Sequence, residues 1–223
     1  MMGILDEAKQ RTAIFQDRLG QAGHEIALIT DESSIAYLAG FWGYLAVEFG
    51  RPTFLILRSG HAPVVLTPLM EHEMVSAMTW VGDVRTWQDS GDQRWENVLA
   101  EILGPGLKRL AVERDVLPAI VRNWLDEHYP GIALDDASVE LGQMRMIKSA
   151  GEIEVMKKAG EIAGAMMKAA HGSLAEGVQE FESALAVIAA GSRKAAGFLT
   201  ASGWEAFVSP MIHNLQIVQS GSD

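Results

Sequence analysis

The sequence predicts an α/β fold: a mixed sheet flanked by helices over about residues 1–137, followed by a mainly helical segment over 138–223. Two observations predict it. Short apolar or β-branched runs alternate with helical patterns up to about residue 137, which is typical of an α/β layer domain. Beyond that point helical spacing dominates. The composition, 48% hydrophobic and 21% charged, is that of an ordinary globular protein.

The first part is expected to hold six strands and five helices. Glycines at positions 20 and 23 end the first helix, and Asp31 to Ser34 caps the second, which Gly40 ends. A turn at 58–61 joins two strands as a hairpin. Pro68 is expected at the first position of the helix that follows. The predicted strands are 26–29, 53–57, 64–66, 84–87, 110–112 and 132–134, and the predicted helices are 4–19, 35–39, 68–78, 95–103 and 118–127.

The second part begins with a capping box, in which Ser149 and Glu152 satisfy free backbone N–H groups at a helix start. Apolar residues from Ile153 to Ala170 fall on one stripe of this helix, and a second helix is expected over 181–194. The residue pattern then predicts strands at 207–211 and 215–218. Two helices and the start of a sheet are too little to close a core, so we expect either a partner to cover them or a longer protein to contain them.

Charge and composition exclude several classes of function. The net charge of −11, with 18 basic and 29 acidic residues and no basic run, disfavours nucleic acid as a partner. No stretch of about 20 apolar residues is present, which argues against a membrane span. The first residues lack the pattern of a secretory signal, so a cytoplasmic location is expected by default. The absence of cysteine excludes disulfides and thiolate chemistry.

Candidate chemistry is sparse. The six histidines form no metal-binding motif, and neither a nucleophile elbow nor a phosphate-binding loop occurs. The cluster Glu71-His72-Glu73 points in three directions on a helix, so a solvated helix face is expected there. Arg51, between a glycine and a proline just before a strand, could present its planar fork to a carboxylate. The alternative is an arginine at a strand edge paired with a surface acid.

Three segments in order resemble the creatinase/Xaa-Pro peptidase family of pita-bread metallohydrolases. Residues 31–41 resemble a segment of the family's N-terminal domain, and residues 145–153 are similar to the junction before its catalytic domain. Residues 215–221 look like a strand that leads to a catalytic histidine in this family. The three segments read DESSIAYLAGF, RMIKSAGEI and LQIVQSG.

The resemblance implies a creatinase-type, ribonuclease H-like N-terminal domain over 1–137 and an incomplete part of the pita-bread domain over 138–223. It implies hydrolysis of C–N bonds, as in Xaa-Pro dipeptidases and aminopeptidase P. A complete family member would hold two divalent metal ions, such as Mn, Co or Zn. Those ligands and the shuttle histidine are expected beyond Asp223, so no catalytic residue and no metal ligand is assigned to this chain. We expect the chain alone to be inactive.

The resemblance also assigns a substrate-binding role to four residues. Phe49 and Arg51 match an F-x-R motif with which one subunit of a homodimer reaches the active site of its mate. Arg51 would hold a carboxylate of a small peptide or small carboxylate substrate, while Trp42 and Tyr44 would line the pocket. Two alternatives stay open: a non-catalytic dimerisation or small-carboxylate-binding module, and a truncated product without an independent role.

Overall fold

The computed structural model describes residues 3–43, 45 and 49–202. Within it the chain divides into two compact units, Met1–Ile147 and Lys148–Asp223, and each is described by itself. The elements of the first unit are α1 (Ile4–Gln21), β1 (Ile26–Ile29), α2 (Glu32–Ala39), β2 (Phe54–Arg58), β3 (Val64–Pro68), η1 (Leu69–Glu71), α4 (His72–Met78), β4 (Asp83–Trp87), η2 (Gly91–Gln93), α5 (Trp95–Leu103), β5 (Arg109–Val112), α6 (Ala119–His128), β6 (Ala133–Asp136) and α7 (Ser138–Met146). Those of the second are α8 (Ala150–Ser173) and α9 (Glu180–Ser202).

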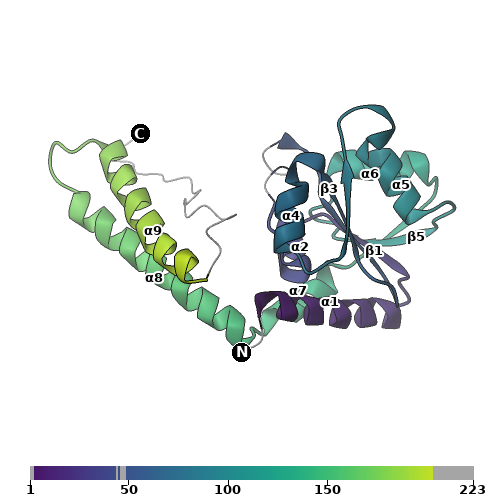
Figure 1. Ribbon diagram of the computed structural model, residues 1–223, viewed down its shortest axis with the longest axis horizontal. Helices are drawn as coiled ribbons and strands as arrows, with labels where there is room; N and C mark the ends of the chain where they lie inside the picture. Colours follow the sequence, from purple (N-terminus) through teal and green to yellow (C-terminus); the bar gives the residue numbers. More distant parts are fainter. Residues whose placement is uncertain (1–2, 44, 46–48, 203–223) are drawn as a thin grey trace. The chain divides into compact units, whose positions relative to one another are not determined.

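One mixed sheet of six strands organises the first unit, in the order β4-β3-β2-β1-β5-β6 (Figure 1). β1 lies near the centre, antiparallel to β2 and parallel to β5. The hairpin of β2 and β3 is antiparallel, with Phe54 opposite Leu66, and β4 and β6 extend the sheet in parallel at its two edges. The predicted α/β class and the predicted hairpin are confirmed.

Helices cover both faces of this sheet and create two separate apolar cores. α1, α2, α4 and α7 contribute to the core on one face, together with Ala27 and Ile29 of β1. α5 and α6 contribute to the other, together with Ile26 and Leu28 of the same strand (Figure 1). Because successive side chains of a strand point to opposite faces, an unbroken apolar run such as residues 26–29 belongs at the centre of a sheet covered on both sides.

Two boundaries differ from the sequence-based expectation. Pro68 is the last residue of β3, and a short 3-10 turn separates it from α4. The parallel pairing of Pro68 with Trp87 of β4 keeps Pro68 in the sheet. The compact first unit also continues to Ile147, because Leu141 of α7 is buried in its core. The assignment of 1–137 and 138–223 to two domains of an enzyme stays a prediction.

Polar side chains from other elements hold the end of α2. The carbonyl oxygen of Leu38 accepts hydrogen bonds from Thr12 Oγ1 and from Trp80 Nε1, both at 2.8 Å. Gly40 ends the helix with a φ of +82°, and a Cβ at this position would meet the side chain of Leu5 at 2.6 Å. A non-glycine residue would therefore be strained at Gly40 by its backbone, and the end of the Leu5 side chain would have to shift.

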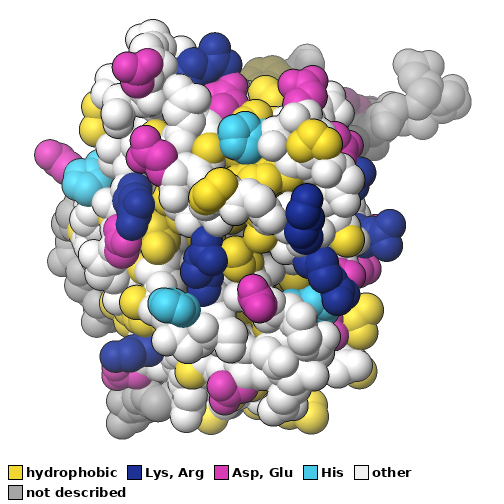
Figure 2. Space-filling model, turned by 90° about the vertical axis from the view of Figure 1, so that its right-hand side faces the viewer, with side chains coloured by type: hydrophobic (Ala, Val, Ile, Leu, Met, Phe, Trp, Pro, Cys, Tyr) yellow, Lys and Arg dark blue, Asp and Glu magenta, His cyan; other side chains and the backbone are white. Residues whose placement is uncertain are grey.

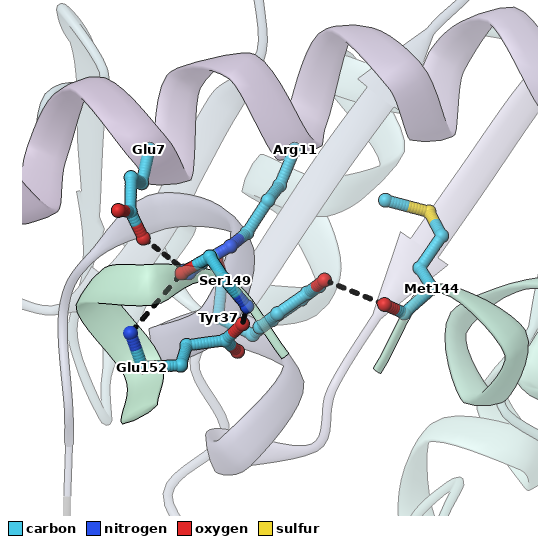
Figure 3. Close-up of polar contacts among 6 residues, drawn as sticks. All are labelled: Glu7, Arg11, Tyr37, Met144, Ser149 and Glu152. Atoms are coloured by element: carbon cyan, nitrogen blue, oxygen red, sulfur yellow. Dashed lines mark hydrogen bonds and ion pairs between the residues drawn. The ribbon is translucent and has the colours of Figure 1, made fainter. Parts of the chain in front are cut away.

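Aromatic and basic side chains join α1, α2 and α7. Tyr37 of α2 donates from its hydroxyl to the carbonyl oxygen of Met144 at 3.3 Å (Figure 3). Arg11 of α1 places its guanidinium 4.5 Å from the centre of the Tyr37 ring and pairs with Glu7 at 2.7 Å. These contacts explain why α7, although it follows the last strand, packs within the first unit.

The second unit, as far as it is described, consists of two packed helices. The predicted capping box is present: Ser149 Oγ accepts from Glu152 N at 3.1 Å, and Ser149 N donates to the Glu152 carboxylate at 2.7 Å (Figure 3). An ion pair of 2.8 Å joins Lys194 of α9 to Glu161 of α8. α9 continues to Ser202, beyond the predicted end at 194, because it contains no proline and an isolated glycine such as Gly197 only weakens a helix. The expected strands at 207–211 and 215–218 lie outside the described residues.

The apolar stripe of α8 is exposed in this unit. Ile153, Met156 and Met167 expose 44%, 56% and 71% of their surface, and α8 contributes no buried residue. Two helices alone cannot bury both of their apolar faces, as the sequence indicated. Over residues 3–43, 45 and 49–202, the structure contains no helix with the length and apolar character needed to cross a bilayer.

A buried carboxylate lies where β5 ends and α2 begins. Glu113, 6% exposed, accepts a hydrogen bond of 2.6 Å from Ser34 Oγ, while its other oxygen is buried without a partner among the described residues. Burial raises the pKa of Glu113 to about 7, and the neighbouring charge of Asp31 acts in the same direction. The hydrogen bond from Ser34 and the charge of Arg145 oppose this rise.

The raised pKa of Glu113 predicts that stability depends on pH. The folded state holds the Glu113 proton more tightly than the unfolded state, so this contribution is complete below pH 4.5 and is lost as the pH rises through about 7. We expect Glu113→Gln to raise the free energy of unfolding at pH 8 by about 1–3 kcal/mol, with little change at pH 4.5. Urea unfolding at pH 4.5 and pH 8 measures these free energies. Glu101→Gln, at an exposed position, is the control and should keep the wild-type pH dependence of stability. If Glu113→Gln also keeps the wild-type pH dependence, the prediction is contradicted.

Candidate functional site

The backbone before β2 is fixed at both ends of the segment that carries Arg51. The amide of Arg51 donates to the carbonyl oxygen of Leu45 at 3.1 Å, and Leu45 is buried. Gly50 takes a φ of +63°, a conformation that favours glycine. The indole N–H of Trp87, at the end of β4, donates to the carbonyl oxygen of Pro52 at 3.0 Å. The backbone at Arg51 is thus held on one side by the buried Leu45 and on the other by Trp87 of the edge strand β4.

The guanidinium of Arg51 contacts two side chains from other parts of the chain. Its Nη2 lies 2.5 Å from Oδ2 of Asp89, and its Nη1 lies 3.1 Å from the sulfur of Met70. The side chain of Arg51 is 35% exposed and that of Asp89 is 61% exposed. The pairing with a surface acid is the arrangement expected of a strand-edge arginine. It also shows that a carboxylate oxygen can approach this guanidinium.

The other predicted substrate-binding residues are at the surface or outside the described part. Phe49 and Trp42 expose 64% and 56% of their surface. Both rings are accessible to a ligand, and their role in binding stays a prediction. Tyr44 lies outside the described residues. Met70, 68% exposed, and Asp89 were not anticipated, since sequence spacing alone does not reveal that η1 and the segment after β4 reach Arg51.

Glu71 corrects the expectation of a solvated helix face over residues 71–73. It is only 2% exposed, and its Oε2 accepts from Thr67 Oγ1 at 3.1 Å and from Thr53 Oγ1 at 3.4 Å. The two threonine hydroxyls lie 2.9 Å apart. The second oxygen of Glu71 is buried without a partner among the described residues, and a Cβ on Gly43 would lie 3.6 Å from it. The carboxylate therefore lies close to Gly43.

A sequence signal for the buried Glu71 did exist. Once Phe54 is paired with Leu66 in the hairpin, Thr53 and Thr67 fall opposite each other, with Glu71 one helical turn after Thr67. Hydroxyls at these positions can satisfy a buried carboxylate. Helix geometry alone predicted that Glu71 is solvated, because it takes no account of the packing of η1 onto the sheet.

The described residues do not fit the pair of metal ions that the family resemblance implies. Within 3–43, 45 and 49–202, no three His, Cys, Asp or Glu side chains converge as metal ligands would. Asp135 instead accepts hydrogen bonds from Nε and Nη2 of Arg109, at 3.0 and 3.1 Å. We therefore derive no metal-dependent step from this part of the chain.

A cavity of about 210 Å³ lies among β2, β3, β4 and α5, lined by residues other than those around Arg51. Its two arginines already have partners: Arg58 donates to the carbonyl oxygens of Ile102 and Leu103, and Arg85 pairs with Asp83 at 3.0 Å. Figure 2 shows basic, acidic and histidine side chains interspersed with hydrophobic ones on one face of the molecule. We assign no site to this cavity.

Comparison with known proteins identifies the class to which this fold belongs. Residues 11–147 match the creatinase/prolidase N-terminal domain family, and the chain belongs to this family. The match covers the whole sheet with α2, Arg51 and Glu71, and it ends where the first compact unit ends.

Individual relatives agree with that assignment. The chain is 26% identical to the prolidase of Thermococcus sibiricus, with a TM-score of 0.70 over 82% of this chain and 49% of that one. The fold also matches the isolated N-terminal domain of an X-Pro dipeptidase from Streptococcus pyogenes, with 23% identity and a TM-score of 0.53 over 60% of this chain and 98% of that one. Among curated proteins, it is 25% identical to the uncharacterized hydrolase/peptidase y4tM of Sinorhizobium fredii, over 81% of this chain and 48% of the relative. The chain thus spans about half the length of the curated relatives it matches.

The two threonines around Glu71 predict a specific loss of stability. We expect Thr67→Val to lower the free energy of unfolding by about 1–3 kcal/mol, because it removes a donor from a buried carboxylate. Thermal or urea unfolding measures the change. Thr86→Val is the matched control: Thr86 pairs with Thr67 across β3 and β4, and no hydrogen bond of its hydroxyl appears among the described contacts. Equal losses in both variants would mean that the hydrogen bond to Glu71 contributes little.

Proposed function

We propose that this chain forms the N-terminal part of a hydrolase that cleaves Xaa-Pro dipeptides, and that Arg51 binds the substrate carboxylate. Family membership over residues 11–147 and the likeness to prolidases support the reaction class. The observation that carries the role of Arg51 is its guanidinium, held at the surface and already in contact with a carboxylate oxygen.

The chemistry of a dipeptide ending in proline suits the groups on this segment. Such a substrate presents a carboxylate beside an apolar pyrrolidine ring. A guanidinium donates two parallel hydrogen bonds to a carboxylate, and an arginine is better suited to this than a lysine. The exposed ring of Phe49, two residues before Arg51, would pack against the apolar ring.

We further propose that the protein acts as a homodimer in which Phe49 and Arg51 of one subunit complete the active site of the other. Both residues lie at the surface of the first unit, where a second subunit could contact them. Any metal ions would be held by residues outside the described part of this chain, and the contribution of Arg51 is to bind and orient the substrate.

Carboxylate binding tests this function directly. We expect N-acetyl-L-proline to bind the 223-residue chain weakly, and Arg51→Ala to weaken binding at least about tenfold, because charged hydrogen bonds contribute roughly 1.5–3 kcal/mol. Arg51→Lys should be intermediate, since it keeps the charge but loses the fork. NMR titration measures the dissociation constants, with Arg85→Ala as control, an exposed arginine that also pairs with an aspartate.

Hydrolysis of Gly-Pro distinguishes the alternatives. If a form of the protein turns over Gly-Pro, Arg51→Ala should mainly raise KM, because the carboxylate contact is made in both ground and transition states. If the protein binds N-acetyl-L-proline but no form of it, longer forms included, hydrolyses Gly-Pro, the small-carboxylate-binding module is favoured. Equal binding by wild type and Arg51→Ala, or no binding by either, would refute the proposed role of Arg51.

A further inference from the structure

Asp89 is held beside Arg51 by the structure of the sheet edge. β4 ends at Trp87, whose indole is hydrogen-bonded to the carbonyl oxygen of Pro52. The next residue, Gln88, donates its amide to the carbonyl oxygen of Gln93 at 2.7 Å, which closes the segment that contains Asp89. The contact between Arg51 and Asp89 is therefore supported by the backbone, because the segments that carry the two residues are both held by hydrogen bonds.

Asp89 and Met70 together occupy both terminal nitrogens of the Arg51 guanidinium. Asp89 uses one oxygen on Nη2, and the Met70 sulfur lies against Nη1. Each terminal nitrogen carries two N–H groups, so a ligand carboxylate that binds through Nη1 and Nη2 competes with these two contacts for donors on the same two nitrogens. Each is weak: an exposed ion pair contributes little, and a thioether is a poor acceptor.

We propose that Asp89 is an internal counter-carboxylate that occupies Arg51 in the absence of ligand and is displaced when a substrate carboxylate binds. This inference rests on the proposed function of Arg51. Asp89 then determines specificity. A ligand with a free carboxylate offers two charged oxygens and displaces the single contact of Asp89, whereas a neutral amide end offers no charge to compete with it.

The direction in which Asp89→Asn changes carboxylate affinity shows whether Asp89 competes with the ligand or orients Arg51. Asp89→Asn removes the competing charge and retains the shape of the side chain. If Asp89 competes, the variant binds carboxylates more tightly. If Asp89 instead stays in place and orients Arg51, the variant binds them more weakly. Because exposed ion pairs contribute up to roughly 1 kcal/mol, the expected tightening is up to about fivefold.

The experiment compares two ligands on three proteins. Wild type, Asp89→Asn and Asp83→Asn are titrated by NMR with N-acetyl-L-proline and with N-acetyl-L-prolinamide, which lacks the charge. Asp83 is the matched control, an exposed aspartate on β4 that pairs with Arg85 rather than Arg51. We expect Asp89→Asn alone to tighten carboxylate binding, by up to about fivefold, and neither variant to change amide binding.

A measurement without ligand tests the pairing itself. The Nη2–H signal of Arg51, assigned by its loss in Arg51→Lys, should exchange faster with water in Asp89→Asn than in wild type or Asp83→Asn. Unchanged exchange, or unchanged or weaker carboxylate binding in Asp89→Asn, would overturn the role of Asp89. If Arg51→Ala binds N-acetyl-L-proline as wild type does, the proposed function of Arg51 fails instead. In that case, faster exchange in Asp89→Asn would show that Arg51 and Asp89 form an ion pair, but that this pair has no role in binding.

Discussion

The pairing of β1 with β2 on one side and β5 on the other is the interaction on which the first unit depends. All four residues of β1 are buried, because helices cover the sheet on both faces. The same strand supplies Ala27 and Ile29 to one core and Ile26 and Leu28 to the other. It is therefore the point at which two otherwise separate apolar clusters are joined into one folding unit.

The candidate site depends on the other half of this sheet. The register of β2 with β3 brings Thr53 to Thr67 and so creates a polar position for Glu71. The parallel pairing of β3 with β4 brings Trp87 to Pro52, and with it Asp89 to Arg51. Groups that are far apart in the sequence meet because strand register leaves them little freedom, and an arginine on a fixed backbone loses less entropy when it binds a ligand.

Two buried carboxylates show how the fold tolerates polar groups in its interior. Glu71 receives hydrogen bonds from two threonines, whereas Glu113 receives one from Ser34, and burial raises its pKa to about 7. A buried carboxylate with few donors favours its protonated form. Glu113 is therefore a source of pH-dependent stability at the start of α2.

Local sequence patterns were sufficient to predict the α/β class, the hairpin, the end of α2 at Gly40 and the capping box at Ser149, since each follows from local spacing or from backbone geometry that one or two residues impose. They also pointed to Arg51. The burial of Glu71, the inclusion of α7 in the first unit and the neighbours of Arg51 became apparent from the three-dimensional fold. These features depend on contacts between segments about 20 to 110 residues apart. Local patterns carry no information about such contacts until strand order and register are known.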